Sequence, residues 1–214
     1  ADAREAERGP APCRMPVVGD RVVSRFELTR VLGSGGMGVV FEARDSREGE
    51  VVALKWLRRR GHVESLRREF RALSDLHHPN LTQYFELFID PHAIFLTMER
   101  IEGVPLDVAL SRSAGDVDHV ASAFRQLASA LGFLHAAGIV HCDLKPANVL
   151  VEPTGRVRVV DFGLAQHREA LPHRLLGTPA YAAPEVAARR EHGPAADWYA
   201  FGKMLSAALT ASPA

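Results

Sequence analysis

Residues 141–150 read HCDLKPANVL, a short polar segment that runs into an apolar stretch. Asp143, Lys145 and Asn148 place a carboxylate, an ammonium and a neutral amide oxygen close together along the chain. A carboxylate can accept the proton of an attacking hydroxyl, and an ammonium can neutralise charge on a transferring phosphoryl group. An amide oxygen suits a hard cation such as Mg²⁺. A polar turn that merely enters a strand would leave this combination unexplained, so the segment predicts phosphoryl transfer.

A second acidic position stands in VVDFGLA, residues 159–165. Asp161 ends an apolar, strand-like run, and Phe162 and Gly163 follow it directly. A carboxylate at such a place can bridge Mg²⁺ and phosphate oxygens while the phenylalanine packs beneath. Asn148 and Asp161 are therefore the predicted metal ligands.

A glycine-rich stretch, GSGGMGVV at residues 33–40, lies between two strand-like runs. Gly33, Gly35 and Gly38 have G-x-G-x-x-G spacing, which alone fits a Rossmann loop, a flexible hairpin or chance. A Rossmann loop opens a helix, whereas this stretch continues into a strand. Strand, glycine loop and strand is the order in which a hairpin lies over nucleotide phosphates, because glycine lets the backbone approach the phosphate oxygens. A plain hairpin remains the alternative.

The run VVALKWL at residues 51–57 carries Lys55 among apolar residues, where an unpaired ammonium would be costly. Glu69, on the helix predicted next, is the natural counter-ion, and Glu64 at the start of that helix is a competitor. A Lys–Glu pair can hold the lysine against the α and β phosphates of a nucleotide. A snorkelling surface lysine explains Lys55 alone, but it fits less well beside the glycine-rich stretch.

The remaining pattern predicts strands first and helices afterwards. The strand-like runs are 25–33, 39–45, 51–57, 81–89 and 92–100, with one helix over 64–76 among them. Two later helices are predicted over 118–137 and roughly 195–210. The first of these places five apolar residues on one face: Val120, Phe124, Leu127, Leu131 and Leu134. Sheet first and helices afterwards predicts an α+β protein with two segregated lobes.

Further motifs follow in GTPAYAAPE (177–185) and DWYAFG (197–202). Taken together and in this order, the motifs resemble those of the eukaryotic-type (Hanks-type) serine/threonine protein kinases. The set comprises the glycine loop, VALK, Glu69, HCDLKPAN, DFG and these two motifs, and its sequence is similar to that of bacterial members. The resemblance covers roughly residues 20–210. It implies a two-lobed fold in which an N-lobe antiparallel sheet with one helix precedes a mainly helical C-lobe.

Residues 1–19 mix charged residues, Ala, Pro and Gly without an apolar period, which predicts a disordered leader or linker. The resemblance implies an N-lobe over 20–101 and a C-lobe over 102–214. The visible C-lobe is expected to be incomplete, since it stops after the helix that carries Asp197. The implied reaction is transfer of the γ-phosphoryl group of ATP to Ser or Thr hydroxyls of protein substrates, with Mg²⁺ or alternatively Mn²⁺.

The resemblance also implies a role for each matching position. The catalytic residues are Asp143, Lys145, Lys55 and Glu69, and the metal ligands are Asn148 and Asp161. The nucleotide-binding residues are Gly33, Ser34, Gly35, Gly36, Gly38, Val40, Ala53, Lys55, the gatekeeper Met98, and Glu99 to Ile101 as the hinge. Thr178 is expected to contact the catalytic loop, Asp197 to accept N–H bonds from its backbone, and Glu185 to pair with an arginine beyond Ala214.

Cys142 departs from the family pattern, which has an arginine that reads a phosphorylated activation loop. No Ser, Thr or Tyr occurs from Leu164 through Gly177, so the usual phosphate acceptor is missing as well. We therefore expect an enzyme that is not switched by activation-loop phosphorylation. Cys142 itself is either a plain buried thiol or a site sensitive to oxidants and electrophiles.

Two other functions are open to this sequence. A pseudokinase scaffold would bind nucleotide without catalysis, but such proteins typically lack one of the catalytic positions, and all are present here. A small-molecule kinase of the aminoglycoside-phosphotransferase type shares a related catalytic loop. The GTPAYAAPE stretch argues against it, because that stretch forms a shelf for a peptide acceptor.

Composition narrows the partners and the compartment. Lys plus Arg and Asp plus Glu each number 26, so the formal net charge is zero, which argues against binding nucleic acid or anionic membrane through bulk charge. The two cysteines, Cys13 and Cys142, lack metal-site or redox-pair spacing, which predicts a reducing, cytoplasmic compartment. No apolar run approaches the ~18 residues of a transmembrane helix. The oligomeric state is not indicated.

Overall fold

The computed structural model describes residues 15–36, 38–57, 63–90, 93–112, 116–162, 180–188 and 193–210. The chain forms two compact units. The first comprises Ala1–Phe70 and Gln83–Arg100, and the second comprises Arg71–Thr82 and Ile101–Ala214. Residues 71–82 thus cluster with the second unit although a part of the first unit follows them in sequence.

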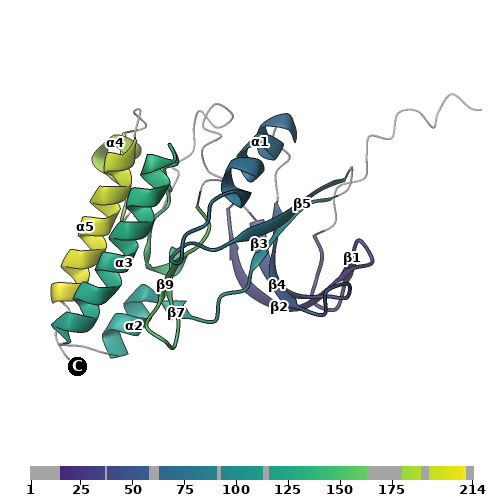
Figure 1. Cartoon of the computed structure of the whole chain (residues 1–214), viewed down its shortest axis with the longest axis horizontal. Coiled ribbons are helices and arrows are strands. Elements are labelled where there is room, and N and C mark those ends of the chain that lie inside the picture. Colours follow the sequence, from purple (N-terminus) through teal and green to yellow (C-terminus); the bar gives the residue numbers. More distant parts are fainter. Residues whose placement is uncertain are drawn as a thin grey trace, which may run out of the picture. The chain divides into compact units, whose positions relative to one another are not determined.

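The first unit is an antiparallel sheet of six strands in the order β1-β2-β3-β4-β6-β5 (Figure 1). The strands are β1 (Arg21–Val22), β2 (Phe26–Gly35), β3 (Gly38–Asp45), β4 (Val51–Leu57), β5 (Tyr84–Asp90) and β6 (Ala93–Glu99). Helix α1 (Val63–Ser74) follows β4. The five predicted strands are confirmed, and β1 is an addition, since its two residues are too short to show an alternating pattern.

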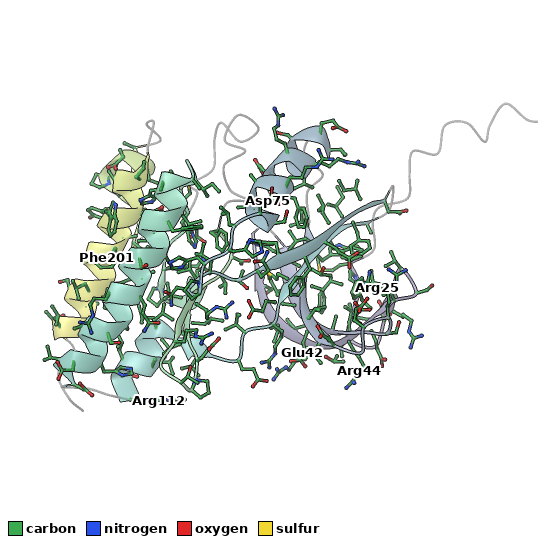
Figure 2. All side chains as sticks on the ribbon, in the orientation of Figure 1. Arg25, Glu42, Arg44, Asp75, Arg112 and Phe201 are labelled. Atoms are coloured by element: carbon green, nitrogen blue, oxygen red, sulfur yellow. The ribbon has the colours of Figure 1, made fainter. Side chains whose placement is uncertain are left out.

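Aromatic side chains fill the core on one face of this sheet. The rings of Phe88 and Phe95 stack with centroids 4.5 Å apart, and Phe26 meets them edge-on at 5.4 and 6.0 Å. At the rim, Arg25 binds Asp45 at 2.6 Å and Glu86 at 2.7 Å (Figure 2). The hydrogen bond from Arg25 lowers the pKa of Asp45 to about 2. This cluster ties the turn before β2 to the end of β3 and to β5.

Two predicted boundaries were wrong. Helix α1 ends at Ser74, so Leu76 lies outside it, and β5 begins at Tyr84 rather than Leu81. Leu81 instead forms an isolated parallel bridge with Val159, whose N–H donates to the Asn80 carbonyl at 2.8 Å. The segment before β5 therefore bonds to a strand of the second unit, a long-range pairing that local periodicity cannot reveal.

The second unit is mainly helical. Its helices are α2 (Leu106–Arg112), α3 (Val117–Ala136), α4 (Pro184–Ala187) and α5 (Pro194–Thr210), with a 3₁₀ turn, η1, at Pro146–Asn148. A small antiparallel sheet, β7 (Val104–Pro105), β8 (Val149–Val151) and β9 (Val157–Val159), completes it. The α+β class is confirmed. Helix α2 and this sheet were not predicted from the sequence, and the strands of the sheet are only two or three residues long.

Helices α3 and α5 lie side by side, α3 in teal and α5 in yellow (Figure 1). Phe124 of α3 meets Phe201 of α5 edge-on, with centroids 5.2 Å apart (Figure 2). All five apolar residues predicted on one face of α3 are buried, as expected. The Asp116 carboxylate caps α3 by accepting the N–H of His119 at 2.9 Å. Across the described residues, no helix has the length and apolarity needed to cross a membrane.

Candidate active site

Asp143, Lys145 and Asn148 come together in the second unit. The Lys145 Nζ lies 2.7 Å from Asp143 Oδ2. The Asn148 Nδ2 donates to the Asp143 carbonyl at 2.8 Å and approaches its Oδ2 at 3.4 Å. Because the amide nitrogen is used within the loop, the amide oxygen of Asn148 is the atom left to bind a cation. The loop thus holds one carboxylate between a cation and an amide.

Asp197 of α5 holds the start of this loop. Its side chain is 1% exposed and accepts the backbone N–H groups of His141 at 2.8 Å and Cys142 at 3.0 Å. His135 Nε2, in the last turn of α3, lies 2.9 Å from the same carboxylate. One buried carboxylate therefore ties α3, α5 and the loop together, which satisfies groups that would be costly to bury unpaired.

Two histidines in this network were not predicted from the sequence. His141 is fully buried, with the Asp143 N–H 3.3 Å from its Nδ1 and the Val160 carbonyl 3.2 Å from its Nε2. Since Nδ1 accepts the hydrogen bond from Asp143, the ring proton belongs on Nε2, where it can be donated to the Val160 carbonyl. The ring thus acts as a fixed spacer between Asp143 and Val160. His135 and His141 carry no local signal, because their partner Asp197 lies far along the chain.

Two residues of the site adopt left-handed backbone conformations. Cys142 has φ 66° and Asp161 has φ 60°, and neither is glycine. Such a conformation costs about 1–2 kcal/mol for a residue with a Cβ and persists only where its surroundings enforce it. Cys142 is held there by the bond from its N–H to Asp197. Strain of this kind gathers at functional sites, which agrees with the positions of Cys142 beside Asp143 and of Asp161 as a predicted ligand.

The two predicted metal ligands leave the same end of one hairpin. Asn148 immediately precedes β8 and Asp161 follows β9, and Val149 pairs with Val159 in register. The Val160 N–H also donates to the Asn148 carbonyl at 3.0 Å. Phe162, next to Asp161, is fully buried and anchors this segment.

The donor set at this end of the hairpin fits Mg²⁺ that arrives with a nucleotide. Within the described parts of the chain, no group of three His, Cys, Asp or Glu side chains is placed to hold a metal by itself. Mg²⁺ in proteins commonly takes one or two carboxylate or amide oxygens and completes its shell with water and phosphate. The predicted ligands, Asn148 and Asp161, carry oxygen atoms of that kind and number, so the residues present fit the cation.

In the first unit, the predicted nucleotide-binding residues of the central strands share one face of the sheet. Lys55 of β4 stands opposite Val40 of β3, and Ala53 of β4 stands opposite Met98 of β6. Directly paired residues lie on the same face, as do residues two apart on one strand. These four residues therefore lie on the face opposite to the aromatic core. Lys55 is only 3% exposed despite its charge.

The glycines of the β2–β3 hairpin fall into two kinds. A Cβ on Gly38 would lie 1.9 Å from the Trp56 carbonyl oxygen, so the sheet itself requires a glycine there. A Cβ on Gly33, Gly35 or Gly36 would meet nothing within 4 Å. Open space at Gly33, Gly35 and Gly36 is compatible with the predicted phosphate contact, which stays a prediction, while Gly38 also has a structural reason for its size. Ser34, which lies between Gly33 and Gly35, is exposed.

Glu69 is the more buried of the two acidic candidates on α1, since Glu64 is exposed. Burial raises the pKa of Glu69 to about 7, against the opposing effect of the neighbouring Arg68. A carboxyl in this range is partly protonated at neutral pH, so a nearby ammonium would strengthen its charged form. The pairing of Lys55 with Glu69 stays a prediction.

The remaining predicted positions are placed as follows. Glu99 ends β6, donating its N–H to the Gln83 carbonyl at 2.8 Å, and Ile101 follows half-buried. Glu185 is half-buried in α4. Thr178 and the hydroxyl-free segment from Leu164 through Gly177 lie outside the described residues.

The sequence matches the family model described as "Protein kinase domain" over residues 26–214. It is 39% identical over 196 residues to CBL-interacting protein kinase 16 of Oryza sativa subsp. japonica, covering 86% of this chain and 43% of that protein. It is 36% identical over 202 residues to serine/threonine-protein kinase PknA of Mycobacterium tuberculosis, covering 87% of this chain and 47% of that protein. The chain thus spans less than half the length of these relatives. The match over most of its length shows that this chain belongs to the protein kinase domain family.

Proposed function

We propose that the protein transfers the γ-phosphoryl group of ATP to Ser or Thr hydroxyls of protein substrates. The observation that carries the proposal is the loop in which Lys145 Nζ and Asn148 Nδ2 both converge on Asp143 Oδ2, at 2.7 and 3.4 Å. The related chains include proteins named as Ser/Thr kinases, which supports the choice of acceptor.

In this proposal Asp143 orients the acceptor hydroxyl and takes its proton as the oxygen attacks. Lys145 sits within bonding distance of that carboxylate, where it can offset negative charge on the transferred group. Bound ATP supplies the phosphoryl group, and Mg²⁺ neutralises charge on its phosphates. Asn148 and Asp161 would hold the cation, while Lys55 and the β2–β3 hairpin would hold the triphosphate.

We also propose that activation does not depend on phosphorylation of the segment 164–177, which contains no hydroxyl side chain. Cys142 supports this, because it replaces the arginine that would bind a phosphorylated residue in this segment. Its backbone is held instead by the bond from its N–H to Asp197. The Cys142 Sγ makes a weak contact with the Val140 carbonyl at 3.6 Å, as a structural thiol does. Phosphatase treatment of the purified protein is expected to leave the initial rate unchanged, and a large drop would contradict the proposal.

An acceptor comparison tests the reaction. The full-length protein is incubated with radiolabelled ATP and, in parallel, with a generic protein substrate and with an aminoglycoside. Label on protein Ser or Thr supports the proposal. Label on the aminoglycoside would identify a small-molecule kinase, and nucleotide binding without any transfer would identify a pseudokinase scaffold.

A further inference from the structure

A polar groove of about 450 Å³ lies in the second unit between α3 and the turn that joins β8 to β9. Three of its lining residues, His119, Ser122 and Gln126, share one face of α3. The others that matter here are Thr154, Gly155 and Arg156 of the turn. The volume is within the range of ligand pockets, roughly 300–1,000 Å³. The groove is separate from the loop that carries Asp143.

The floor of the groove is fixed by the amide of Gln126. Its Oε1 accepts from the Val157 N–H at 3.0 Å and from Asn80 Nδ2 at 2.9 Å. Its Nε2 donates to the Gly155 carbonyl at 3.0 Å. Every polar atom of this side chain is therefore used to hold the hairpin against α3. A groove with such a floor is preformed, so little ordering is needed when a ligand binds.

The rim offers hydrogen-bond donors that the fold does not use. The imidazole of His119, the hydroxyl of Ser122 and the guanidinium of Arg156 bond to no other residue in the described ranges. The Thr154 hydroxyl differs, because it already accepts the Arg156 N–H at 3.4 Å. Three unused donors from two elements, around a fixed floor, favour an anionic ligand.

The charges around the groove favour a ligand with a single negative charge. Among the described residues that line the groove, Arg156 is the one permanent cation. The carboxylate of Glu152, on the same hairpin, is already bound to Arg158 at 3.3 Å. Asp116 accepts the backbone N–H of His119 at 2.9 Å, and Asp118 is exposed beside His119. A carboxylate would balance Arg156, whereas a doubly charged phosphate would leave excess negative charge near these acids.

We propose that this groove binds an Asp or Glu side chain in an acidic segment of the protein substrates. The assignment of the segment to substrates rests on the proposed function, but binding itself does not. The hairpin whose tip carries Arg156 carries Asp161 at its other end, five residues away, or about 16 Å at strand spacing. That spacing is the most that five residues can span, so a substrate segment of about five or more extended residues is long enough to reach from Arg156 to the end of the hairpin that carries Asp161.

The test measures binding without ATP. A fluorescein-labelled, eight-residue peptide of alternating Glu and Ala, with no Ser, Thr or Tyr, is titrated with the full-length protein at low salt. Arg156→Gln is compared with the wild type and with Arg125→Gln, which removes an exposed arginine of α3 outside the groove. Arg156→Gln is expected to weaken binding about fivefold, which corresponds to about 1 kcal/mol for one partly exposed charge pair. Arg125→Gln is expected to bind as the wild type does.

Specificity controls use the same readout. The peptide with Gln in place of Glu is expected to bind at least about fivefold more weakly than the Glu peptide, and inorganic phosphate is expected to compete no better than chloride at equal ionic strength. Equal binding by the wild type and Arg156→Gln would overturn the proposal. Stronger competition by phosphate would overturn it in favour of a phosphorylated ligand.

A transfer assay separates this inference from the proposed function. A short Ser peptide without acidic residues is expected to be phosphorylated equally by the wild type and Arg156→Gln. Adding a Glu-rich segment six residues from the serine is expected to lower the KM of the wild type alone. An unchanged KM would remove the link to substrates. If no variant transfers phosphate yet the binding difference persists, the groove is supported and the kinase proposal fails.

Discussion

The 141–148 loop and the β2–β3 hairpin are both predicted to hold parts of one reaction, yet they are built differently. In the loop, Asp143 bonds to Lys145 and Asn148, and Asp197 fixes the backbone at His141 and Cys142. In the β2–β3 hairpin, three of the four glycines face open space, where a Cβ would meet nothing within 4 Å. The loop is thus held by its own hydrogen bonds, whereas the hairpin leaves open space at the positions where we propose that the nucleotide binds.

Removing Asp197 is expected to have the largest effect on stability. Asp197→Ala leaves two buried backbone N–H groups and His135 without their shared acceptor. A loss of roughly 3–5 kcal/mol in the free energy of unfolding is expected. Urea denaturation measures it, with Asp118→Ala, an exposed acid on α3, as the matched control. A loss similar to that of the control would show that the loop does not depend on this carboxylate.

Two glycine substitutions in the β2–β3 hairpin test whether its glycines are needed for packing or for nucleotide binding. Gly38→Ala places a methyl group 1.9 Å from the Trp56 carbonyl and is expected to cost about 2–3 kcal/mol of stability, because β3 and β4 must separate. Gly35→Ala meets no protein atom and is expected to change stability by less than about 1 kcal/mol. Its effect should appear instead as a raised KM for ATP.

Denaturation and steady-state kinetics on both variants check this pair. If Gly35→Ala unfolds as easily as Gly38→Ala, the hairpin is held by its own packing at both positions. If Gly35→Ala leaves the KM for ATP unchanged, the hairpin does not contact the nucleotide at that residue.

Glu69 gives a smaller effect that depends on pH. Its pKa is raised to about 7 from an ordinary value of 4.5, so the folded state favours the protonated form. The stability from this group is fully present below about pH 4.5 and is lost as the pH rises through 7. Glu69→Gln keeps a neutral side chain, so at pH 8 it is expected to be more stable than the wild type by on the order of 1 kcal/mol, reduced for partial exposure.

The same variant tests the predicted pair with Lys55, because an amide cannot form an ion pair with the ammonium. A loss of activity is expected if that pair holds the lysine during transfer. Thermal unfolding at pH 4.5 and pH 8, together with transfer rates, gives both readouts. A stability difference that does not change with pH would contradict the assigned pKa shift, and full activity would contradict the Lys55–Glu69 pair.

Much of the fold follows from local pattern, and the rest depends on contacts between distant segments. Alternation over 25–33 and strand-like apolar runs elsewhere located the five longer strands, and helical spacing located the buried face of α3. The two-residue β1 and the β7–β9 sheet are too short to show a period. Leu81 left its expected strand because Val159, 78 residues later, offered a backbone partner.

The candidate site likewise contains residues that the local sequence predicts and residues whose roles depend on distant contacts. Asp143, Lys145 and Asn148 were identified together because they are near in sequence, and the resemblance implied that Asp197 accepts backbone N–H groups from the loop. The structure has those bonds. His135 and His141 were missed, since their roles appear only when α3 and α5 bring them to Asp197 and when Val160 lies beside the loop. Gly38 was assigned to phosphate contact from its spacing, and the Trp56 carbonyl gives a further, structural reason for a glycine at this position.

We propose above that the loop around Asp143 carries out phosphoryl transfer. The most direct measurement compares the wild type with Asp143→Asn for transfer of radiolabelled phosphate to a protein substrate, while ATP affinity is measured on the same samples. We expect the transfer rate to fall by a factor of about 10²–10⁴, as for loss of a general base, with ATP affinity within about threefold of the wild type. A variant that binds ATP and still transfers phosphate at the wild-type rate would contradict the account.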